Sequence, residues 1–470
     1  MLPKPLAALA NALREAKDKA EVYVVGGALR DLLLGREPHD YDLATSLFPE
    51  EIMAVALRKG WAYHPTGIAF GTITVVVEGL PVEVTTLRRE GRYLNGRRPS
   101  EVQLGGTLEE DLARRDFTIN AMAMAWPEGT LHDPFGGRQD LQRRLIRAVG
   151  SPGERFSEDG LRLLRAVRLA AELEFRLEGE TQVALATRAH MIRLVAAERI
   201  YPEMERLILS PGAAKGLTWL LQSGLLSLLM PEAVPLLTTP PDGTYHALNL
   251  WDHTMEVVRL TPARPEVRWA AFFHDIGKPY TRQVDDEGNA HFPNHDAVGA
   301  ELVDRIAQRL RFPQAKAERI RTLVARHMFT FDMGPRGMRR LYAQLGGEGL
   351  RDLLDLKLAD MVGTGGRFVA DAYDAFTEFR KRLDDTLAQS TAFTVRDLKV
   401  DGHDVMAVLG IPPGPRVGEV LELLLNEVLE DPSLNQRPYL LRRLEELASD
   451  AKEPPSEDPP PDPHSRRDPH

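Results

Sequence analysis

The stretch "VVGGALRDLLLGREPHDYDLAT", residues 24–45, combines a glycine turn with two closely spaced aspartates. A β-branched run ends at Gly26 and Gly27, and the next segment has the apolar spacing of a short helix. Glycines let the backbone approach a ligand closely, and free N–H groups at a helix start favour an anion. Arg30, one turn into this helix, adds a guanidinium for phosphate. The alternative is an ordinary strand-to-helix turn.

The two aspartates predict a metal site. If the segment is extended, Asp40 and Asp42 point to the same face, because residues i and i+2 of a strand do so. Adjacent carboxylates repel each other unless a cation lies between them, and carboxylate oxygens suit Mg²⁺ bound together with substrate phosphates. Such a pair can hold the metals of a phosphoryl transfer, with Glu83 on a neighbouring predicted strand as the third carboxylate. The pattern therefore predicts a nucleoside triphosphate that reacts at its α-phosphate, and a metal-free turn is the alternative.

Length and composition bound the class of protein. A chain of 470 residues with 43 % hydrophobic residues predicts several packed domains. The absence of cysteine excludes disulfides, thiolate zinc sites and cysteine nucleophiles. The first residues lack the apolar core of a signal peptide, and no run approaches the roughly 20 apolar residues of a membrane span. We expect a soluble cytoplasmic protein with no membrane partner.

The charge distribution predicts a polyanionic substrate. The net charge of −10 by itself argues against nucleic acid. However, "LRREGRYLNGRR" (87–98) holds five arginines against one glutamate, and further arginine clusters follow at 113–115, 141–147 and 161–168. Dense arginine near paired carboxylates favours a polyphosphate or nucleic-acid substrate. Arginines scattered over solvated surfaces are the alternative.

The pattern along the chain predicts a mixed α/β start followed by helices. We expect a helix at 5–18, a strand at 21–25, and two antiparallel strands within 70–88 joined around Gly79. From about residue 155 to 448, leucine and arginine recur at helical spacing, without an internal repeat. A proline-rich break at 231–243 and a boundary near 390 divide this part, and the last 20 residues are expected to be disordered.

The segment "EDGLRLLRAVRLAAELEF" (158–175) predicts a reader of nucleotide bases. Cytosine and adenine present an amino donor beside an unprotonated ring nitrogen, whereas guanine and uracil present a carbonyl beside a ring N–H. A carboxylate that accepts and an arginine that donates would select cytosine and adenine. Asp159 and Arg162 are three apart on the predicted helix and would form one reader. Arg165 and Arg168 continue the row, to reach phosphates or to hold the reader, and a surface ion pair is the alternative.

A second candidate site is rich in histidine. "FFHDIGKP" (272–279) places His274 beside Asp275 near a helix end. Neutral imidazoles and carboxylates together suit transition metals, and open metal positions would allow phosphoester hydrolysis by a metal-activated water. Histidines that serve only the structure are the alternative. The candidate ligands are His253, His274, Asp275, His295, His327 and Asp360.

Three motifs carry a resemblance to a known family. "GGALRDLLLG…DYDLAT" resembles the head-domain signature of tRNA nucleotidyltransferases and bacterial poly(A) polymerases, which belong to the polymerase-beta superfamily. "EEDLARRDFTINAMA" (109–123) is similar to the second motif of that family, and 158–175 is similar to its nucleotide-selecting motif. The resemblance implies Mg²⁺, CTP and ATP, and template-independent addition of C-C-A to the tRNA 3′ end. It implies that Arg115 contacts the nucleotide and that Asp116 and Asn120 organise the site; a purely structural role is the alternative for Asn120.

The resemblance leaves the product open. The segment 87–102 matches a loop that the family needs for the terminal A, and its full length favours complete C-C-A addition or addition of A alone. Poly(A) polymerases carry a basic stretch before the third strand, where this chain has "HPTGIAFGTITV" (64–75) like the tRNA enzymes. Residues 398–444 also resemble the tRNA-binding tail of those enzymes. A poly(A) polymerase and an enzyme that adds only A or only C-C are the alternatives.

The histidine-rich segment resembles the HD phosphohydrolase superfamily. That resemblance implies a phosphatase or 2′,3′-cyclic phosphodiesterase activity with Ni²⁺ or Mn²⁺. A vestigial domain is one alternative, and a phosphohydrolase whose head only binds RNA is another; the oligomeric state stays open. The expected fold is multidomain, with an α/β nucleotidyltransferase head of the polymerase-beta type followed by all-α neck, HD and tail domains. The expected divisions are a head at 1–148, a neck that selects the nucleotide and binds RNA at 149–230, an HD domain at 231–390, a tRNA-binding tail at 391–450 and a disordered tail at 451–470.

Overall fold

The computed structural model describes residues 2–90, 93–94, 98–99, 102–240, 249–364 and 369–450. The chain divides into two compact units, Met1–His327 with Asp355–Gly366, and Met328–Leu354 with Arg367–His470. Much of the predicted loop at 87–102, the end of the proline-rich break and the predicted tail at 451–470 lie outside the described residues. The expected domain boundaries remain predictions. Within the described ranges, no helix combines the length and the apolar character needed to cross a membrane.

The first unit opens with a mixed sheet of seven strands in the order β11-β10-β1-β2-β5-β4-β3. The neighbours β2 and β5 run parallel, and the antiparallel pair β4 and β5 confirms the two strands expected within 70–88. The β-branched run "TITVVV" of β4 alternates between half-buried and buried positions, as a strand on a packed sheet requires. The strands are β1 (Val22–Val25), β2 (Tyr41–Thr45), β3 (Ala62–Gly67), β4 (Thr72–Val77), β5 (Leu80–Thr86), β10 (Ala123–Ala125) and β11 (Leu131–His132).

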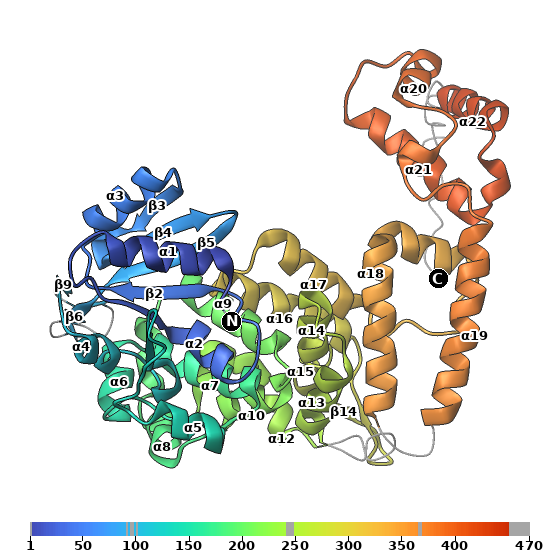
Figure 1. Cartoon of the computed structure of the whole chain (residues 1–470). Helices are drawn as coiled ribbons and strands as arrows, with labels where there is room; N and C mark the ends of the chain where they lie inside the picture. The colour runs from blue at the N-terminus through green and yellow to red at the C-terminus, as the bar shows by residue number, and fades with distance from the viewer. Residues whose placement is uncertain are drawn as a thin grey trace, which may run out of the picture. The chain divides into compact units, whose positions relative to one another are not determined.

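Helices pack on the sheet and leave one strand end for a site. The helices α1 (Lys4–Glu15) and α3 (Pro49–Lys59) lie against β4 and β5 (Figure 1). In α1, Leu6, Leu9 and Leu13 are fully buried, and their spacing gives the helix one apolar face. The helix α2 (Gly26–Leu33) starts directly where β1 ends, which places the glycine turn beside β2.

The rest of the chain is mainly helical, as the periodicity from residue 155 predicts. Short strands occur at β6 (Arg88–Glu90), β7 (Tyr93–Leu94), β8 (Arg98–Pro99), β9 (Val102–Leu104), β12 (Leu145–Ile146), β13 (Arg176–Leu177), β14 (Gln283–Val284) and β15 (Ala290–His291). The further helices of the first unit are α4 (Leu108–Ala113), α5 (Gly137–Arg143), α6 (Pro152–Glu158), α7 (Leu161–Leu173), α8 (Gly179–Thr187), α9 (Ala197–Leu209), α10 (Ala213–Gln222), α11 (Leu225–Leu229), α12 (Pro235–Thr238), α13 (Leu250–Leu260), α14 (Pro265–Phe273), α15 (Lys278–Thr281), α16 (His295–Leu310) and α17 (Gln314–Arg326).

The second unit is helical and has a core of its own. It holds the first part of α18 (Pro335–Gly363) together with α19 (Val369–Ala388), α20 (Gly402–Leu409), α21 (Pro415–Glu430) and α22 (Arg437–Asp450). Val405, Leu424 and Leu440 lie at the centre of its C-terminal cluster, and all three are fully buried. The end of α18, from Asp355 onward, belongs to the first unit and brings Asp360 to it.

The expectation of one helix carrying both Asp159 and Arg162 is wrong. The helix α6 ends at Glu158, α7 begins at Leu161, and Asp159 between them is extended with φ −144° and ψ 108°. Its carboxylate accepts a hydrogen bond from the Leu161 N–H at 3.0 Å, and a short acidic side chain that bonds the backbone in this way competes with helix continuation.

Replacing Gly160 with alanine should destabilise the first unit, because the added Cβ would overlap the carbonyl oxygen of Met191. Overpacking of this kind costs about 1–3 kcal/mol. We expect a lower urea midpoint for Gly160→Ala in the full chain. Gly179→Ala is the matched control, since its Cβ would meet no heavy atom within 4 Å. Equal midpoints for the two variants would contradict the assigned packing.

Candidate active site and metal centre

A cavity of about 420 Å³ lies where the ends of β1, β2 and β5 meet the helices that follow the sheet. It is strongly charged, with six arginines and four carboxylates along its wall. Ten of the predicted site residues line it, whereas Asp40, Arg30 and Arg168 do not. The charged lining residues are Arg88, Arg114, Arg115, Arg162, Arg165, Arg199, Asp42, Glu83, Asp116 and Asp159.

Asp42 is the acidic centre of this cavity. The parallel register of β2 and β5 places Asp42 opposite Glu83, so two carboxylates lie side by side. Burial raises the pKa of Asp42 to about 6, and the charge of Glu83 adds to that shift while Arg115 opposes it. A divalent cation would relieve the same repulsion, and carboxylate oxygens are the ligands Mg²⁺ prefers, so the residues present fit that ion.

Asp40 lies just before β2, and its side chain is 87 % exposed. Its charge reaches Asp42, because it contributes to the raised pKa of that carboxyl. The shared metal site of the two aspartates remains a prediction.

Position 26 requires glycine because the side chains of Asp42 and Arg115 approach its backbone closely. It adopts φ +69°, a conformation that favours glycine, and a Cβ at this position would lie 2.8 Å from Oδ2 of Asp42. It would also lie 3.2 Å from a guanidinium nitrogen of Arg115. The glycine turn therefore lets the start of α2, a carboxylate and an arginine meet.

Arg30 does not offer its guanidinium to the cavity. It binds both carboxylate oxygens of Asp31, at 2.8 and 2.9 Å, and donates to the amide oxygen of Asn120 at 2.9 Å. In this structure Arg30 orients Asn120, and the predicted phosphate contact remains a prediction.

Asp116 holds the centre of a buried polar network. It accepts from Arg165 Nε at 2.7 Å, from the Phe117 N–H at 2.8 Å and from the Asn120 amide at 3.1 Å. Burial alone would raise the pKa of Asp116, but the charge of Arg165 and the hydrogen bonds from Asn120 and Arg165 together hold that pKa well below its usual range. In turn, Asp116 raises the pKa of Arg165. Asp116 and Asn120 therefore organise the wall of the cavity.

Arg114 and Arg115 share a buried carboxylate. Asp111 binds Arg114 at 2.6 Å and Arg115 at 3.1 Å. Burial favours the neutral acid, but the charges of Arg115 and Arg114 lower the pKa of Asp111. The two guanidinium groups are thereby fixed at the cavity wall, which is the geometry needed for a phosphate chain.

The predicted base-reading residues have separate partners. Arg162 binds Glu158 at 2.5 Å, and Asp159 binds Arg199 at 2.7 Å. Arg199 lies 40 residues beyond Asp159, so no local pattern in the sequence points to this pair. Arg168 is buried and binds Glu172 and Glu203, which favours the expected role of holding α7 in place over a phosphate contact.

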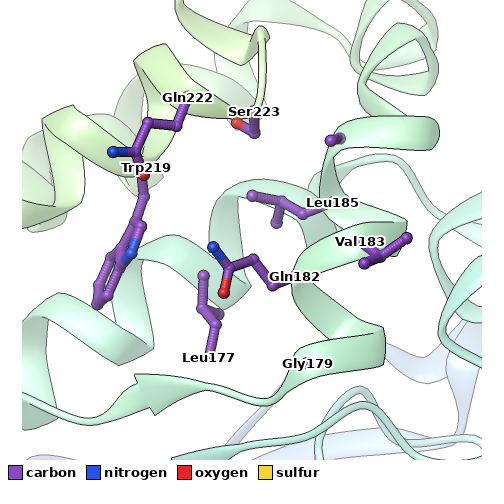
Figure 2. A pocket seen from close by; sticks show the side chains of 9 residues that line it. Leu177, Gly179, Gln182, Val183, Leu185, Trp219, Gln222 and Ser223 are labelled. Carbon is purple, nitrogen blue, oxygen red and sulfur yellow. The ribbon is translucent and has the colours of Figure 1, made fainter.

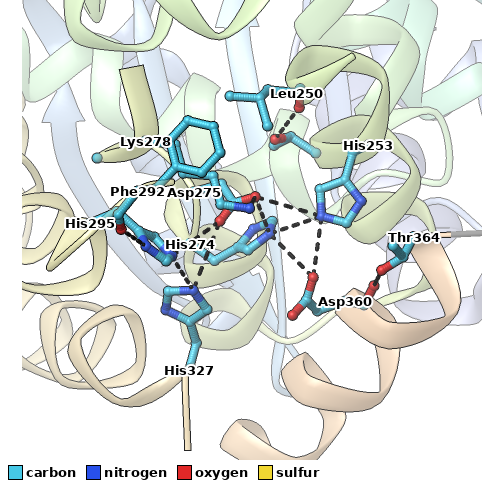
Figure 3. A network of polar contacts seen from close by, with 12 residues as sticks. Leu250, His253, His274, Asp275, Lys278, Phe292, His295, His327, Asp360 and Thr364 are labelled. Atoms are coloured by element: carbon cyan, nitrogen blue, oxygen red, sulfur yellow. Dashed lines mark hydrogen bonds and ion pairs between the residues drawn. The ribbon is translucent and has the colours of Figure 1, made fainter. Parts of the chain in front are cut away.

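A second cluster of titratable groups surrounds Asp275, which follows α14. Oδ2 of this carboxylate lies 3.3 Å from His274 Nε2 and 3.7 Å from His253 Nε2. Oδ1 lies 3.5 Å from His295 Nε2 and 3.9 Å from His327 Nε2. Figure 3 shows Asp275 between the two histidine pairs. Within each pair the two Nε2 atoms are 3.2 Å apart.

The histidines present the atoms that a metal would bind. The Nδ1 atoms of His274, His295 and His327 lie 2.7–2.9 Å from the backbone carbonyl three residues earlier. Each Nδ1 therefore carries the proton, and the Nε2 lone pairs converge on Asp275, as in histidine metal sites. Asp360 joins at 3.2 Å from His253 Nε2. The arrangement forms two ligand groups that share one carboxylate, so the residues present fit a pair of transition-metal ions.

The electrostatics of this cluster keep its carboxylates charged. Burial alone would raise the pKa of Asp275, but the neighbouring His274 and Lys278 hold it well below its usual range. Burial and the neighbouring His274 lower the pKa of His327 to about 4, which leaves that ring neutral and able to bind a metal. Lys278 is a further residue of this cluster that was not among the predicted ligands. Its ammonium nitrogen lies 2.8 Å from Asp275, and the spacing of three residues between them is the signal in the sequence that points to this contact.

A further cavity, of about 290 Å³, lies between α8 and α10 (Figure 2). Trp219 and Gln222 from α10 and Gln182 from α8 border it. Its lining residues include no titratable side chain, so it offers no acid, base or metal ligand.

Three protein-family models match this chain, and the first and the last of them cover the charged cavity and the histidine cluster in that order. A model described as the Poly A polymerase head domain matches residues 22–147, which hold the glycine turn and Asp42. A model described as a probable RNA and SrmB-binding site of polymerase A matches 174–237, and the HD domain model matches 244–362. The fold and the charged cavity thus define a nucleotide-transferring enzyme with an attached HD domain.

Relatives of known name match most of the chain. A CC-adding tRNA nucleotidyltransferase of Thermus thermophilus is 38 % identical over 422 residues, covering 87 % of this chain and 90 % of the relative. An A-adding tRNA nucleotidyltransferase of Deinococcus radiodurans is 36 % identical, covering 85 % and 90 %. The crystal structure of the Bacillus stearothermophilus CCA-adding enzyme in complex with CTP is 28 % identical, covers 96 % and 99 %, and superposes with a TM-score of 0.67. The chain belongs to the tRNA nucleotidyltransferase family.

Gly26→Ala should reduce the rate of nucleotidyl transfer by at least about tenfold. The added Cβ would displace Asp42 Oδ2 and Arg115, and a rise of about 1.4 kcal/mol in the activation free energy lowers the rate tenfold. Gly35→Ala is the matched control, because Gly35 also has φ +69° but no heavy atom within 4 Å of its Cβ. The measurement is kcat/KM for nucleotide incorporation into tRNA. Similar losses in both variants would show that backbone strain, not the close approach, matters.

Proposed function

We propose that this enzyme adds C-C-A, or its terminal A, to the 3′ end of tRNA from CTP and ATP without a template. The observation that supports the proposal best is the cavity in which Asp42 and Glu83 face a wall of arginines. A nucleoside triphosphate needs both a cation-binding carboxylate pair and fixed positive charge around its phosphates. As a tRNA-processing enzyme, the protein would work in the cytoplasm.

In the proposed reaction, the tRNA 3′-hydroxyl oxygen forms a bond to the α-phosphorus and pyrophosphate leaves. Asp42, with Glu83 and Asp40, would hold Mg²⁺, which supplies positive charge at the reacting phosphate when bound. Arg115, fixed by Asp111 beside Gly26, contacts the triphosphate. Such fixed donors stabilise developing charge without reorganising during the reaction.

Asp159 and Arg162 select the base in this proposal. Asp159 accepts a hydrogen bond from the amino group of cytosine or adenine, and Arg162 donates to the adjacent ring nitrogen. Both residues line the cavity, although they come from different sides of the α6–α7 junction. Uracil and guanine would place a carbonyl against Asp159 and an N–H against Arg162, so both contacts would be repulsive.

The product is tested with three transcripts of one tRNA, which end before C-C-A, after C-C and after C-C-A. Each is incubated with Mg²⁺ and CTP, ATP or both, and resolved at single-nucleotide length. A gain of three residues by the shortest transcript identifies the complete enzyme, and extension of only the C-C transcript by one A identifies an A-adding enzyme. A long A tail would favour poly(A) polymerase, a stop after C-C a CC-adding enzyme, and no addition would overturn the proposal.

Asp42→Ala should abolish addition while tRNA binding is retained. Removing this partly buried carboxylate removes the proposed cation site, and a loss of such charge stabilisation is worth on the order of 10²-fold or more in rate. The matched control is Asp18→Ala, an exposed aspartate of the same unit. Incorporation is measured beside tRNA binding by filter retention. Wild-type rates in Asp42→Ala would refute the metal assignment.

We also propose a metal-dependent phosphohydrolase activity in the HD domain. The supporting observation is Asp275, whose two oxygens face two separate histidine pairs. Two metals that share a carboxylate can activate a water for attack on a phosphoester. Ni²⁺ and Mn²⁺ are the candidate metals, since imidazole-rich sites suit such ions.

His295→Ala should lower metal content from two ions to one per chain, because His295 belongs to only one of the two ligand groups. Hydrolysis of 2′,3′-cyclic AMP and bis(p-nitrophenyl) phosphate should fall about 10–100-fold, as is usual when metal coordination is damaged. His291→Ala is the control, since His291 is exposed, binds Asp285 and belongs to neither ligand group. Unchanged metal content in His295→Ala would argue for a vestigial site.

A further inference from the structure

The chain leaves the first unit and returns to it at the histidine cluster. His327 is the last residue of the first unit before the chain enters the second unit, and the chain comes back at Asp355. Asp360 follows on the same helix, α18. Residues 328–354, which we call the excursion, are therefore flanked by two members of the cluster. A later crossing between the units, at 366–367, falls outside the described residues.

The side chains that flank the excursion converge on Asp275. Nε2 of His327 lies 3.9 Å from Oδ1 of Asp275 and 3.2 Å from Nε2 of His295. Oδ1 of Asp360 lies 3.2 Å from Nε2 of His253, which in turn lies 3.7 Å from the other oxygen of Asp275. Figure 3 shows His327 in one histidine pair and Asp360 beside the other. The two ends of a long segment thus meet at one ligand cluster.

His327 faces its neighbours in the cluster with a lone pair. Its Nδ1 lies 2.7 Å from the Val324 carbonyl oxygen and carries the proton, and Nδ1 of His295 lies 2.9 Å from the Phe292 carbonyl oxygen in the same way. Both Nε2 atoms are then acceptors, and so are the oxygens of Asp275. Acceptors that face one another repel, whereas a metal ion between them is attracted by all of them. A bound metal would therefore hold His327 to the cluster.

The helix α18 extends the position of Asp360 into the excursion. This helix is interrupted at Gly346, with φ 65° and ψ 176°, and continues from there across the unit boundary to Gly363. The hydrogen bonds of an α-helix join each residue to the turn before it, so fixing Asp360 also restrains the preceding turns. Those turns include Leu353 and Leu354, which are buried.

We propose that the histidine cluster has a structural function besides hydrolysis: with metal bound, His327 and Asp360 clip together the two ends of the excursion and stabilise its helix. The inference rests on the metal binding proposed above. It does not require hydrolysis, so a cluster without phosphohydrolase activity would still serve the structure of the chain.

A link between the ends of a long segment has a large effect on its opening. About 30 residues separate the two ligands, and a link across them removes conformations that the opened segment would otherwise gain. An opening that detaches His327 or Asp360 must also release metal. The equilibrium constant for that opening therefore falls by the factor 1 + [M]/Kd, which is about 100 when free metal is at about 100 times Kd.

Asp355 offers a matched comparison on the same helix. Its carboxylate binds Arg264, the residue before α14, so it also ties α18 to the first unit. It is not one of the six candidate ligands. Replacing Asp355 with asparagine removes the same charge as replacing Asp360, together with one ion pair, and therefore controls for a purely structural effect on α18.

The first test measures amide hydrogen exchange of the full chain by mass spectrometry. Exchange is compared without metal and with Mn²⁺ or Ni²⁺, whichever binds more tightly, at about 100 times its measured Kd. Peptides from 347–354 should exchange about 100-fold more slowly with metal, although they contain no ligand. Peptides from α22, which packs in the separate C-terminal core, should be unchanged. Unchanged exchange in 347–354, or equal slowing in α22, would overturn the inference.

Variants at both ends test the clip itself. Asp360→Asn detaches the returning end, while the ligand group on the other oxygen of Asp275 stays intact. The slowing in 347–354 should fall from about 100-fold to below about threefold, whereas Asp355→Asn should keep the full effect. His327→Gln tests the other end in the same way, and it replaces Asp360→Asn if circular dichroism shows that this variant fails to fold. Full slowing in the folded variants at both ends would overturn the inference.

Hydrolysis by the same metal-loaded protein separates this inference from the proposed phosphohydrolase. The substrate is bis(p-nitrophenyl) phosphate. Slower exchange in 347–354 without hydrolysis would overturn the phosphohydrolase and support the clip. Hydrolysis with unchanged exchange would overturn only the clip. A chain that binds neither Mn²⁺ nor Ni²⁺ would overturn both.

Discussion

The ion pair between Asp116 and Arg165 joins the segment after α4 to α7, the helix that also carries Arg162. One carboxylate accepts from Arg165 of α7 and from Asn120, whose amide oxygen accepts from Arg30 of α2. The glycine turn, the segment after α4 and the helix α7 therefore meet at one buried charge. Breaking such a pair leaves an uncompensated buried charge, at a cost of about 3–5 kcal/mol. Asp116 and Arg165 both line the charged cavity, so this contact also fixes part of its wall.

The first unit holds two sites of different chemistry on one helical scaffold. The cavity presents carboxylates and arginines, which suit Mg²⁺ and phosphates, whereas the HD cluster presents imidazoles around a central carboxylate, which suit transition metals. The helix α9 contributes Arg199 to the cavity and packs on α7, α14 and α16. His274 follows α14, and His295 begins α16. Both sites therefore depend on the packing of the same helix.

Much of the fold was predictable because its signals are local. Buried leucines at helical spacing predicted α1, and β-branched runs around Gly79 predicted β4 and β5. The junction at Asp159 was not predictable in the same way, because helical periodicity continues through it while the backbone of Asp159 is extended and ends α6. Likewise, Arg168 fits the row of a base reader in sequence, but two glutamates hold it in the interior.

The sequence by itself determined which functional groups are present and which local elements carry them. These are the glycine turn before Asp42, the histidines around Asp275, and a helical chain after the sheet. These depend on residue type and short spacing, which the backbone periods convert into faces and turns. Only the tertiary structure decided which charges are paired. Arg30 turns to Asp31 and Asn120, and Arg199 reaches Asp159 across 40 residues. Coulomb attraction and burial act between groups that folding brings together, so the partners of an arginine are a property of the packed structure.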